Sequence, residues 1–158
     1  MPSIEYAFLA DAADARPGQK FSVLGGGVSR LGGPTFPLRH PHLALVVGLA
    51  VGSDEVGSEM ELRFTVLTPS GTDMANAQAT IVAGGREGDR DSVLTFALDL
   101  WNLSFPEPGD YVIRIVIDGE ERKRLALVLE RRAAPVRRGP RTRRANITPP
   151  FPPTTGQA

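Results

Sequence analysis

The sequence predicts an all-β protein, an antiparallel β-sandwich of about eight strands with a disordered C-terminal tail. Apolar and polar residues alternate with period two through most of the chain, as they do in half-buried strands. Glycine, proline, serine and aspartate gather between the alternating segments, where turns are expected. After residue 130 the alternation stops, and arginine and proline prevail. The spacing of strands and turns fits an immunoglobulin-like or a jelly-roll-like sandwich.

Two segments show the alternation most clearly. Residues 59–68 and residues 111–118 place apolar side chains at alternate positions, so each is expected to form a strand with one buried face. The second segment ends at Asp118-Gly119, a dipeptide that favours a type I′ turn, and leucines at alternate positions follow it. The sequence therefore predicts a β-hairpin around Asp118.

Five further segments are predicted to be strands: residues 4–10, 20–31, 42–51, 77–83 and 92–105. The segment 42–51 is apolar at nearly every position, which indicates a central strand covered on both faces. In the segment 92–105 the apolar positions change parity near Leu100, which predicts a β-bulge or a crossing between sheets. Three glycines at 25–27 interrupt the segment 20–31 and predict a bulge, a bend or a close backbone approach.

Composition limits the possible classes of protein. The chain has 158 residues, of which 41% are hydrophobic and none is cysteine, so disulfides, thiolate catalysis and cysteine-bound metals are excluded. No basic segment precedes a long apolar one at the N-terminus, so a secretory signal is not expected. The longest apolar run, residues 43–50, is much shorter than the about 20 residues that span a bilayer. A cytoplasmic protein without a transmembrane segment is expected.

The net charge of zero hides two oppositely charged parts. Residues 131–158 contain seven arginines and no acidic residue, whereas residues 1–130 contain eleven basic and eighteen acidic residues. The net charges of the two parts are therefore near +7 and −7. We predict a β-sandwich domain over residues 1–130 and a disordered Arg/Pro-rich tail over residues 131–158.

Several short motifs occur in an order that is similar to that of a known family. They are Phe8-Leu9-Ala10-Asp11, the segment 20–27, Phe36-Pro37, the segment 103–111 and Asp118-Gly119. In this order they resemble an uncharacterised bacterial family of small all-β proteins, known only as a domain of unknown function, over most of residues 4–129. The resemblance implies a compact all-β bacterial domain, and it brings no activity, cofactor or catalytic residue with it.

Residues suited to catalysis or metal binding are few. The only histidines are His40 and His42, and no serine lies in a Gly-x-Ser-x-Gly motif, so we expect no catalytic residues and no enzyme activity. In a strand, His40 and His42 point to the same side and are possible metal ligands, but two surface imidazoles are the favoured interpretation. A hydrolase triad that uses one of them stays open. No metal or cofactor is expected.

Three further patterns resemble ligand-binding sites, but for each of them the sequence favours an explanation without a functional role. Glu87, Asp89 and Asp91 alternate in a glycine-containing loop and suit calcium, although solvated loop charge is favoured. The glycine-rich segment 25–33 lacks the Gly-Lys-Ser/Thr ending of a phosphate-binding loop. The aromatic residues Trp101, Phe105 and Tyr111 are possible members of a carbohydrate platform, and core filling is the expectation for them.

The tail carries the strongest functional signal. The predicted partner-binding residues are Arg137, Arg138, Arg141, Arg143 and Arg144. Such density of arginine suits an anionic partner: nucleic acid, a membrane surface, or an acidic protein surface such as another copy of this chain. The segment 147–153 alternatively suits docking of a proline-rich motif in an aromatic groove.

The expected function is a non-catalytic binding or scaffold module whose cationic tail acts as an electrostatic arm. Two alternatives stay open. One is a structural subunit of a homo-oligomeric bacterial assembly in which sheet edges pair. The other is a ligand-binding or enzymatic sandwich with a pocket built from loops.

Overall fold

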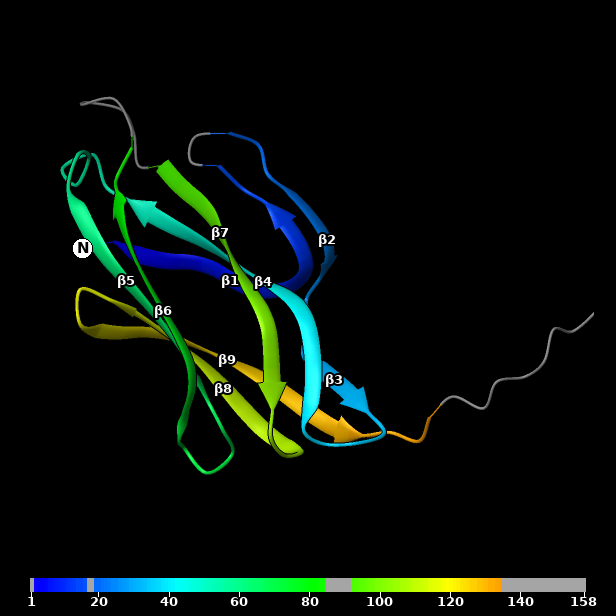
Figure 1. Cartoon of the computed structure of the whole chain (residues 1–158). Helices are drawn as coiled ribbons and strands as arrows, with labels where there is room; N and C mark the ends of the chain where they lie inside the picture. The colour runs from blue at the N-terminus through cyan, green and yellow to red at the C-terminus, as the bar shows by residue number, and fades with distance from the viewer. Residues whose placement is uncertain (1, 17–18, 85–91, 135–158) are drawn as a thin grey trace, which may run out of the picture.

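The computed structural model of the chain describes residues 2–16, 19–84 and 92–134, and these form nine strands (Figure 1). The strands are β1 (Ser3–Asp14), β2 (Ser22–Gly26), β3 (Arg30–Gly33), β4 (Leu38–Val51), β5 (Glu59–Leu67), β6 (Asp73–Val82), β7 (Ser92–Phe105), β8 (Gly109–Ile117) and β9 (Glu120–Arg131). Each predicted strand segment except 20–31 is found as one strand, with boundaries that differ by a few residues. In this part of the chain no helix has the length and apolar character needed to cross a membrane.

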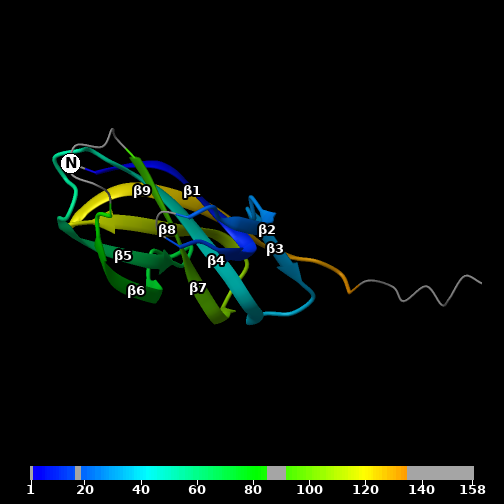
Figure 2. The ribbon, with the colours of Figure 1, turned by 90° about the horizontal axis from the view of Figure 1, so that it is seen from above.

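Two sheets stack face to face, as the views in Figures 1 and 2 show. Sheet A has the order β2-β1-β4-β7, and sheet B has the order β3-β9-β8-β5-β6. All neighbouring strands are antiparallel except β3, which runs parallel to β9. The arrangement matches the immunoglobulin layout, with β4 and β7 in the places of strands B and E and β5, β8 and β9 in those of C, F and G. The fold is therefore an immunoglobulin-like sandwich and not a jelly roll.

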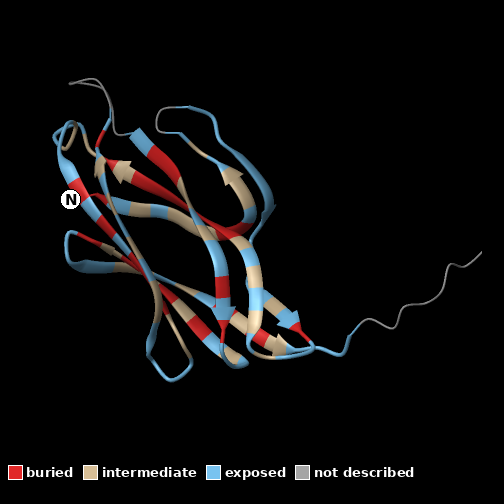
Figure 3. Ribbon diagram, in the orientation of Figure 1, coloured by how far each residue is buried: buried red, intermediate tan, exposed pale blue. Residues whose placement is uncertain are grey.

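The core lies between the sheets and follows the alternation in the sequence. Buried positions alternate with more exposed ones along β5 and β8, as the bands in Figure 3 show. Strand β4 is buried at every position from 43 to 49, because it lies between β1 and β7 and side chains also cover its outer face. This confirms the prediction of a central strand.

The predicted hairpin around Asp118 joins β8 to β9. Asp118 and Gly119 have φ angles of 49° and 82°, the left-handed values that a type I′ turn requires. Asp118 also bonds to the neighbouring strand, because its backbone N–H donates to the carbonyl of Glu61 and its carboxylate accepts from the N–H of Glu61. The turn thereby fixes the end of β8 beside β5.

The segment 20–31 is not one strand, as predicted, but two strands in different sheets. Strand β2 pairs with β1 in sheet A, and β3 pairs with β9 in sheet B. Between them Gly25 and Gly27 have φ angles of 61° and 84°, which other residues rarely adopt. The N–H groups of Gly27 and Val28 both donate to the carbonyl of Leu9, so the chain crosses from one sheet to the other at this point.

The parity change in the segment 92–105 is real, but the predicted β-bulge near Leu100 is wrong. The register of β7 with β4 stays constant along the whole pair. The change occurs at Asn102, whose φ angle is 52° and which lies opposite Pro41. Leu98 and Leu100 therefore face the core before this point, and Leu103 and Phe105 face it afterwards. In both β4 and β7 the residues that face the core change from one set of alternate positions to the other at this point. The register between the two strands therefore stays the same.

The last described residues continue the sheet for a short distance. Strand β9 runs to Arg131, and the backbone N–H of Arg132 donates to the carbonyl of Gly33. The guanidinium carbon of Arg131 lies 5.8 Å from the ring centre of Phe36. The predicted disordered tail lies outside the described residues from 135 onward, and so does the acidic loop with Glu87, Asp89 and Asp91.

Candidate functional site

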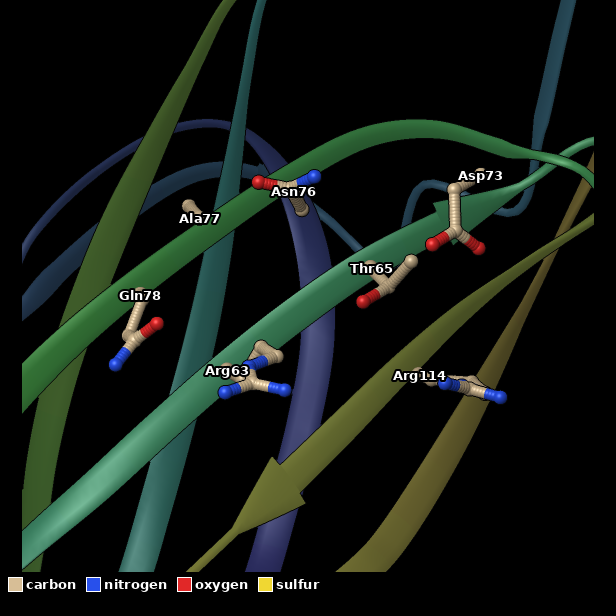
Figure 4. Close-up of a pocket in the computed structure, with 7 residues that line it drawn as sticks. All are labelled: Arg63, Thr65, Asp73, Asn76, Ala77, Gln78 and Arg114. Carbon is tan, nitrogen blue, oxygen red and sulfur yellow. The ribbon is translucent and has the colours of Figure 1, made fainter. Parts of the chain in front are cut away.

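A polar groove of about 320 Å³ lies on the outer face of sheet B. Strands β5, β6 and β8 build it, and Figure 4 shows the side chains that line it. They are Arg63, Thr65, Asp73, Asn76, Ala77, Gln78 and Arg114. The groove is therefore built on rigid strands and not on loops.

The strand register lines these side chains up in two rows. In one row Arg114 lies opposite Thr65, and Thr65 lies opposite Asn76. In the next row Arg63 lies opposite Gln78. Directly opposed residues point to the same face of a sheet, so guanidinium, hydroxyl and amide groups are presented together.

Carboxylates at the rim balance the arginines. Glu61 accepts a hydrogen bond of 3.0 Å from Arg63. The carboxylate of Glu121 accepts hydrogen bonds from Arg124 and lies 3.7 Å from Nε of Arg114. The hydrogen bond from Arg124 is the main reason why the pKa of Glu121 is lowered. Glu121 therefore stays ionised at neutral pH.

The placement of Arg114 departs from two local rules of sheet structure. Arg114 lies directly opposite Arg124, and like charges in opposed positions destabilise a sheet. The Nε atom of Arg114 is buried, and none of the described residues forms a hydrogen bond with it. Positions that break a local rule in this way are often functional.

The groove is suited to binding. Its arginine, asparagine and glutamine side chains offer several N–H donors, and guanidinium groups match carboxylate and phosphate oxygens. Its lining contains no histidine, serine or lysine that would act as a base or nucleophile. The arrangement is able to hold an anionic, hydrogen-bonding ligand.

The outer face of sheet A carries a second polar cluster, centred on His42. Nδ1 of His42 lies 2.7 Å from the carbonyl oxygen of Asp11, and Nε2 lies 2.7 Å from a carboxylate oxygen of Asp99. The ring packs against Trp101, with 4.1 Å between ring centres. Both partners of the ring nitrogens are acceptors, so both nitrogens must carry a proton for both bonds to form. The pKa of His42 is accordingly raised, chiefly by the hydrogen bond to Asp99.

In the doubly protonated form that this geometry favours, His42 is a structural cation. A doubly protonated ring has no lone pair, so it neither accepts a proton nor ligates a metal. It joins the end of the β1–β4 pairing, at the Asp11 carbonyl, to Asp99 on β7. A histidine–carboxylate pair is thus present, but its carboxylate lies on a strand, and the side chain of Asp99 is 50% exposed.

Stability should depend on pH through His42. A raised pKa in the folded state means that the stabilisation is complete below pH of about 6.5 and is lost as the pH rises through the folded-state pKa. Urea unfolding from about pH 5.5 to 8.5 should show this loss in the wild type and not in His42→Gln. His40→Gln is the matched control and should keep the wild-type slope. Equal slopes for all three proteins would contradict the assignment.

The structure corrects two of the expectations for individual residues. His40 is paired with buried Leu103, and His42 with exposed Trp101, so the two histidines face opposite sides and not the same side. Phe105 and Tyr111 fill the core as expected, but Trp101 is 65% exposed. No group of three or more potential ligands is found among residues 2–16, 19–84 and 92–134.

The predicted partner-binding arginines 137, 138, 141, 143 and 144 lie outside the described residues. The groove residues were missed because the alternation in 59–68 and 111–118 shows only that Arg63 and Arg114 face outward. Which outward residues become neighbours depends on the strand order, which the sequence does not reveal.

Solved structures with related folds are distant in sequence. The C-terminal domain of wzt has a TM-score of 0.52 and 11% identity, and the alignment covers 84% of this chain and 75% of that chain. An alkylpurine DNA glycosylase from Pseudomonas fluorescens, bound to DNA with an abasic site analog, has a TM-score of 0.46 and 9% identity over 82% of this chain and 30% of that one. An immunoglobulin-like protein from Pseudomonas aeruginosa has a TM-score of 0.33 and 10% identity over 82% and 97%. At this identity the likeness to the wzt domain concerns the fold alone.

A family model gives the more specific result. No curated protein matches the sequence. The family model, however, matches residues 5–130, which include every strand of both sheets almost completely. The chain therefore belongs to a family of unknown function, DUF6941.

Proposed function

We propose that this protein is a non-catalytic binding module that holds an anionic partner through the arginine-containing groove and the cationic tail. The observation that carries the proposal is the row of Arg114, Thr65 and Asn76 beside Arg63 and Gln78 on one rigid sheet face. Rigid strands keep donors in place, so little ordering entropy is lost on binding.

The groove and the tail favour the same kind of partner. The groove offers two guanidinium groups whose present partners are carboxylates at the rim. An incoming carboxylate or phosphate replaces these partners with a similar geometry. The five arginines between residues 137 and 144 add long-range attraction for the same anion.

The proposal of a non-catalytic role rests on the site chemistry. The groove lining has no histidine, lysine, serine or cysteine, and both ring nitrogens of His42 are engaged with acceptors. The chain would act in the cytoplasm, in keeping with the sequence-based expectation. There the groove would select the partner, and the tail would accelerate the encounter.

The groove is tested with the full-length protein and three anionic probes: a single-stranded oligonucleotide, polyglutamate and vesicles with anionic lipid. We expect the double substitution Arg63→Gln and Arg114→Gln to weaken binding of the preferred probe about tenfold or more, since charged hydrogen bonds contribute about 1.5–3 kcal/mol each. Arg39→Gln, an exposed arginine outside the groove, is the control and should bind as the wild type does. Equal binding by all three proteins would remove the groove from the proposal.

The contribution of the tail is tested with the same three anionic probes. Replacing all five arginines at 137, 138, 141, 143 and 144 by glutamine in the full chain should flatten the salt dependence. For an oligonucleotide, five phosphate contacts predict an affinity loss of roughly 10²–10³-fold in the wild type between about 50 and 200 mM salt. An unchanged salt slope in the variant would show that the tail makes no electrostatic contribution.

A further inference from the structure

Strand β6 is an edge strand with little of the usual protection. It ends the order of sheet B, so one side of its backbone has no partner strand among the described residues. Its pairing with β5 shifts register at Met74, but from Ala75 to Val82 it has no charged residue, no proline, no glycine and no further shift. Natural proteins normally protect an exposed edge with charge, proline, a bulge or a short strand, because an unprotected edge pairs with another chain.

The other three edges of the sandwich do carry such features. Strand β2 has five residues and contains Gly25 and Gly26, and β3 has four residues and ends at Pro34. Strand β7 carries Asp99 and is kinked by the left-handed Asn102. Beyond Met74, β6 therefore presents a long stretch of edge without these features.

An apolar cavity of about 390 Å³ adjoins this edge, between β6 of sheet B and β7 of sheet A. Phe64 and Phe96 lie at its base, with 6.4 Å between ring centres, and Ile81 and Leu98 flank it. Val82 at the end of β6 is 55% exposed. Ile81 and Leu98, which pack against the core, are only partly buried on the side where the edge lacks a neighbour.

We propose that β6 pairs with β6 of a second copy of this chain, antiparallel about a two-fold axis near Gln78. This register sets Asn76 opposite Thr80 and Met74 opposite Val82, so no like charges meet. A ten-residue strand is about 33 Å long, and two stacked sheets present a side about 20 Å wide, so the contact covers about 600 Å² per partner. That area is at the lower limit for a specific dimer, so a weak and reversible dimer is expected.

The pairing also explains the composition of the edge. Two copies of β6 form a continuous ten-stranded sheet from their two five-stranded sheets. The apolar cavities of both copies then lie beside the new contact, and their walls become less exposed to water. The two polar grooves, which include Asn76 and Gln78, come to lie next to each other on the outer face. The inference goes beyond the proposed function and does not depend on which ligand the groove holds.

The natural absence of cysteine allows a direct test in the full-length protein. Single variants Asn76→Cys, Gln78→Cys and Thr80→Cys are oxidised mildly near the dissociation constant and run on non-reducing gels. Gln78→Cys should give several-fold more disulfide-linked dimer than the others, because residues on the axis fall within the about 7 Å between Cα atoms that a disulfide requires. Ser104→Cys, an exposed residue on the β7 edge, is the matched control and should cross-link only at the background level.

Sedimentation equilibrium supplies the second measurement. The wild type should dimerise reversibly, and Gln78→Lys, which places two lysines opposite each other, should raise the dissociation constant at least tenfold. Ser104→Lys should leave it unchanged, and circular dichroism should show all variants folded. A wild type that stays monomeric, or cross-linking of Gln78→Cys no better than Ser104→Cys, would overturn the proposal. Either result would show that the β6 edge does not pair with a second copy of this chain.

Discussion

Replacing Tyr111 by alanine should lower the free energy of unfolding by about 3–5 kcal/mol, the range for removing a large aromatic side chain from a core. Tyr111 is fully buried near the start of β8, and its ring meets that of Phe105 edge to face, with 5.1 Å between centres. Its hydroxyl donates a hydrogen bond of 2.7 Å to the carbonyl of Glu107. This is the tyrosine corner of immunoglobulin-like sandwiches, which fixes the connection between the two sheets. Urea unfolding measures the loss.

The conservative variant separates the ring from the hydroxyl. Tyr111→Phe keeps the packing and should cost about 1–2 kcal/mol, because the carbonyl of Glu107 loses its donor. Burial raises the pKa of Tyr111, so its contribution is complete below pH of about 10 and is lost as the pH rises through the folded-state pKa. The phenylalanine variant should lack this part of the alkaline loss. A variant as stable as the wild type would contradict a role for the corner.

The sequence predicted those parts of the fold that residues close together in the chain determine. The period of two identified the strands, and Asp118-Gly119 identified the one hairpin that a two-residue turn determines. The division of the segment 20–31 was missed, because Gly25 and Gly27 show that the chain bends but not that it changes sheets. Asn102 was missed for a similar reason. Its left-handed backbone acts together with Pro41 on another strand, and the alternation of one segment does not reveal its partner.

The candidate sites were harder to predict because they join distant strands. Asp99 is 57 residues from His42, and nothing in either segment marks them as neighbours. Arg63 and Arg114 were assigned to solvated faces, which is correct for each strand alone. Only the order β8-β5-β6 brings them and Gln78 to one groove. Long-range register, and not residue type, is the missing information.

Gly48 on β4 should tolerate no side chain while Tyr6 is present. A Cβ atom at this position would lie 2.3 Å from Cζ of the Tyr6 ring, which crosses β4 to reach Thr95 on β7. Gly48→Ala should therefore displace the ring, break its hydrogen bond with Thr95 and lower the free energy of unfolding by about 1–3 kcal/mol. Urea unfolding at neutral pH measures the change. Gly84→Ala, where a Cβ atom meets nothing within 4 Å, is the control and should stay within about 0.5 kcal/mol of the wild type.

A double-mutant cycle distinguishes this clash from a general intolerance of alanine at Gly48. When Tyr6→Ala has already removed the ring, Gly48→Ala should be neutral or should stabilise by up to about 1 kcal/mol, because alanine loses less backbone entropy than glycine in a strand. The sign of the effect therefore reverses between the two backgrounds, and the coupling free energy should be about 2 kcal/mol. The same ring stacks on Phe8 and Phe21, at 6.3 and 6.2 Å between centres, so its displacement also loosens the cover of sheet A. A destabilisation by Gly48→Ala that is equal in both backgrounds would mean that Tyr6 does not require the glycine.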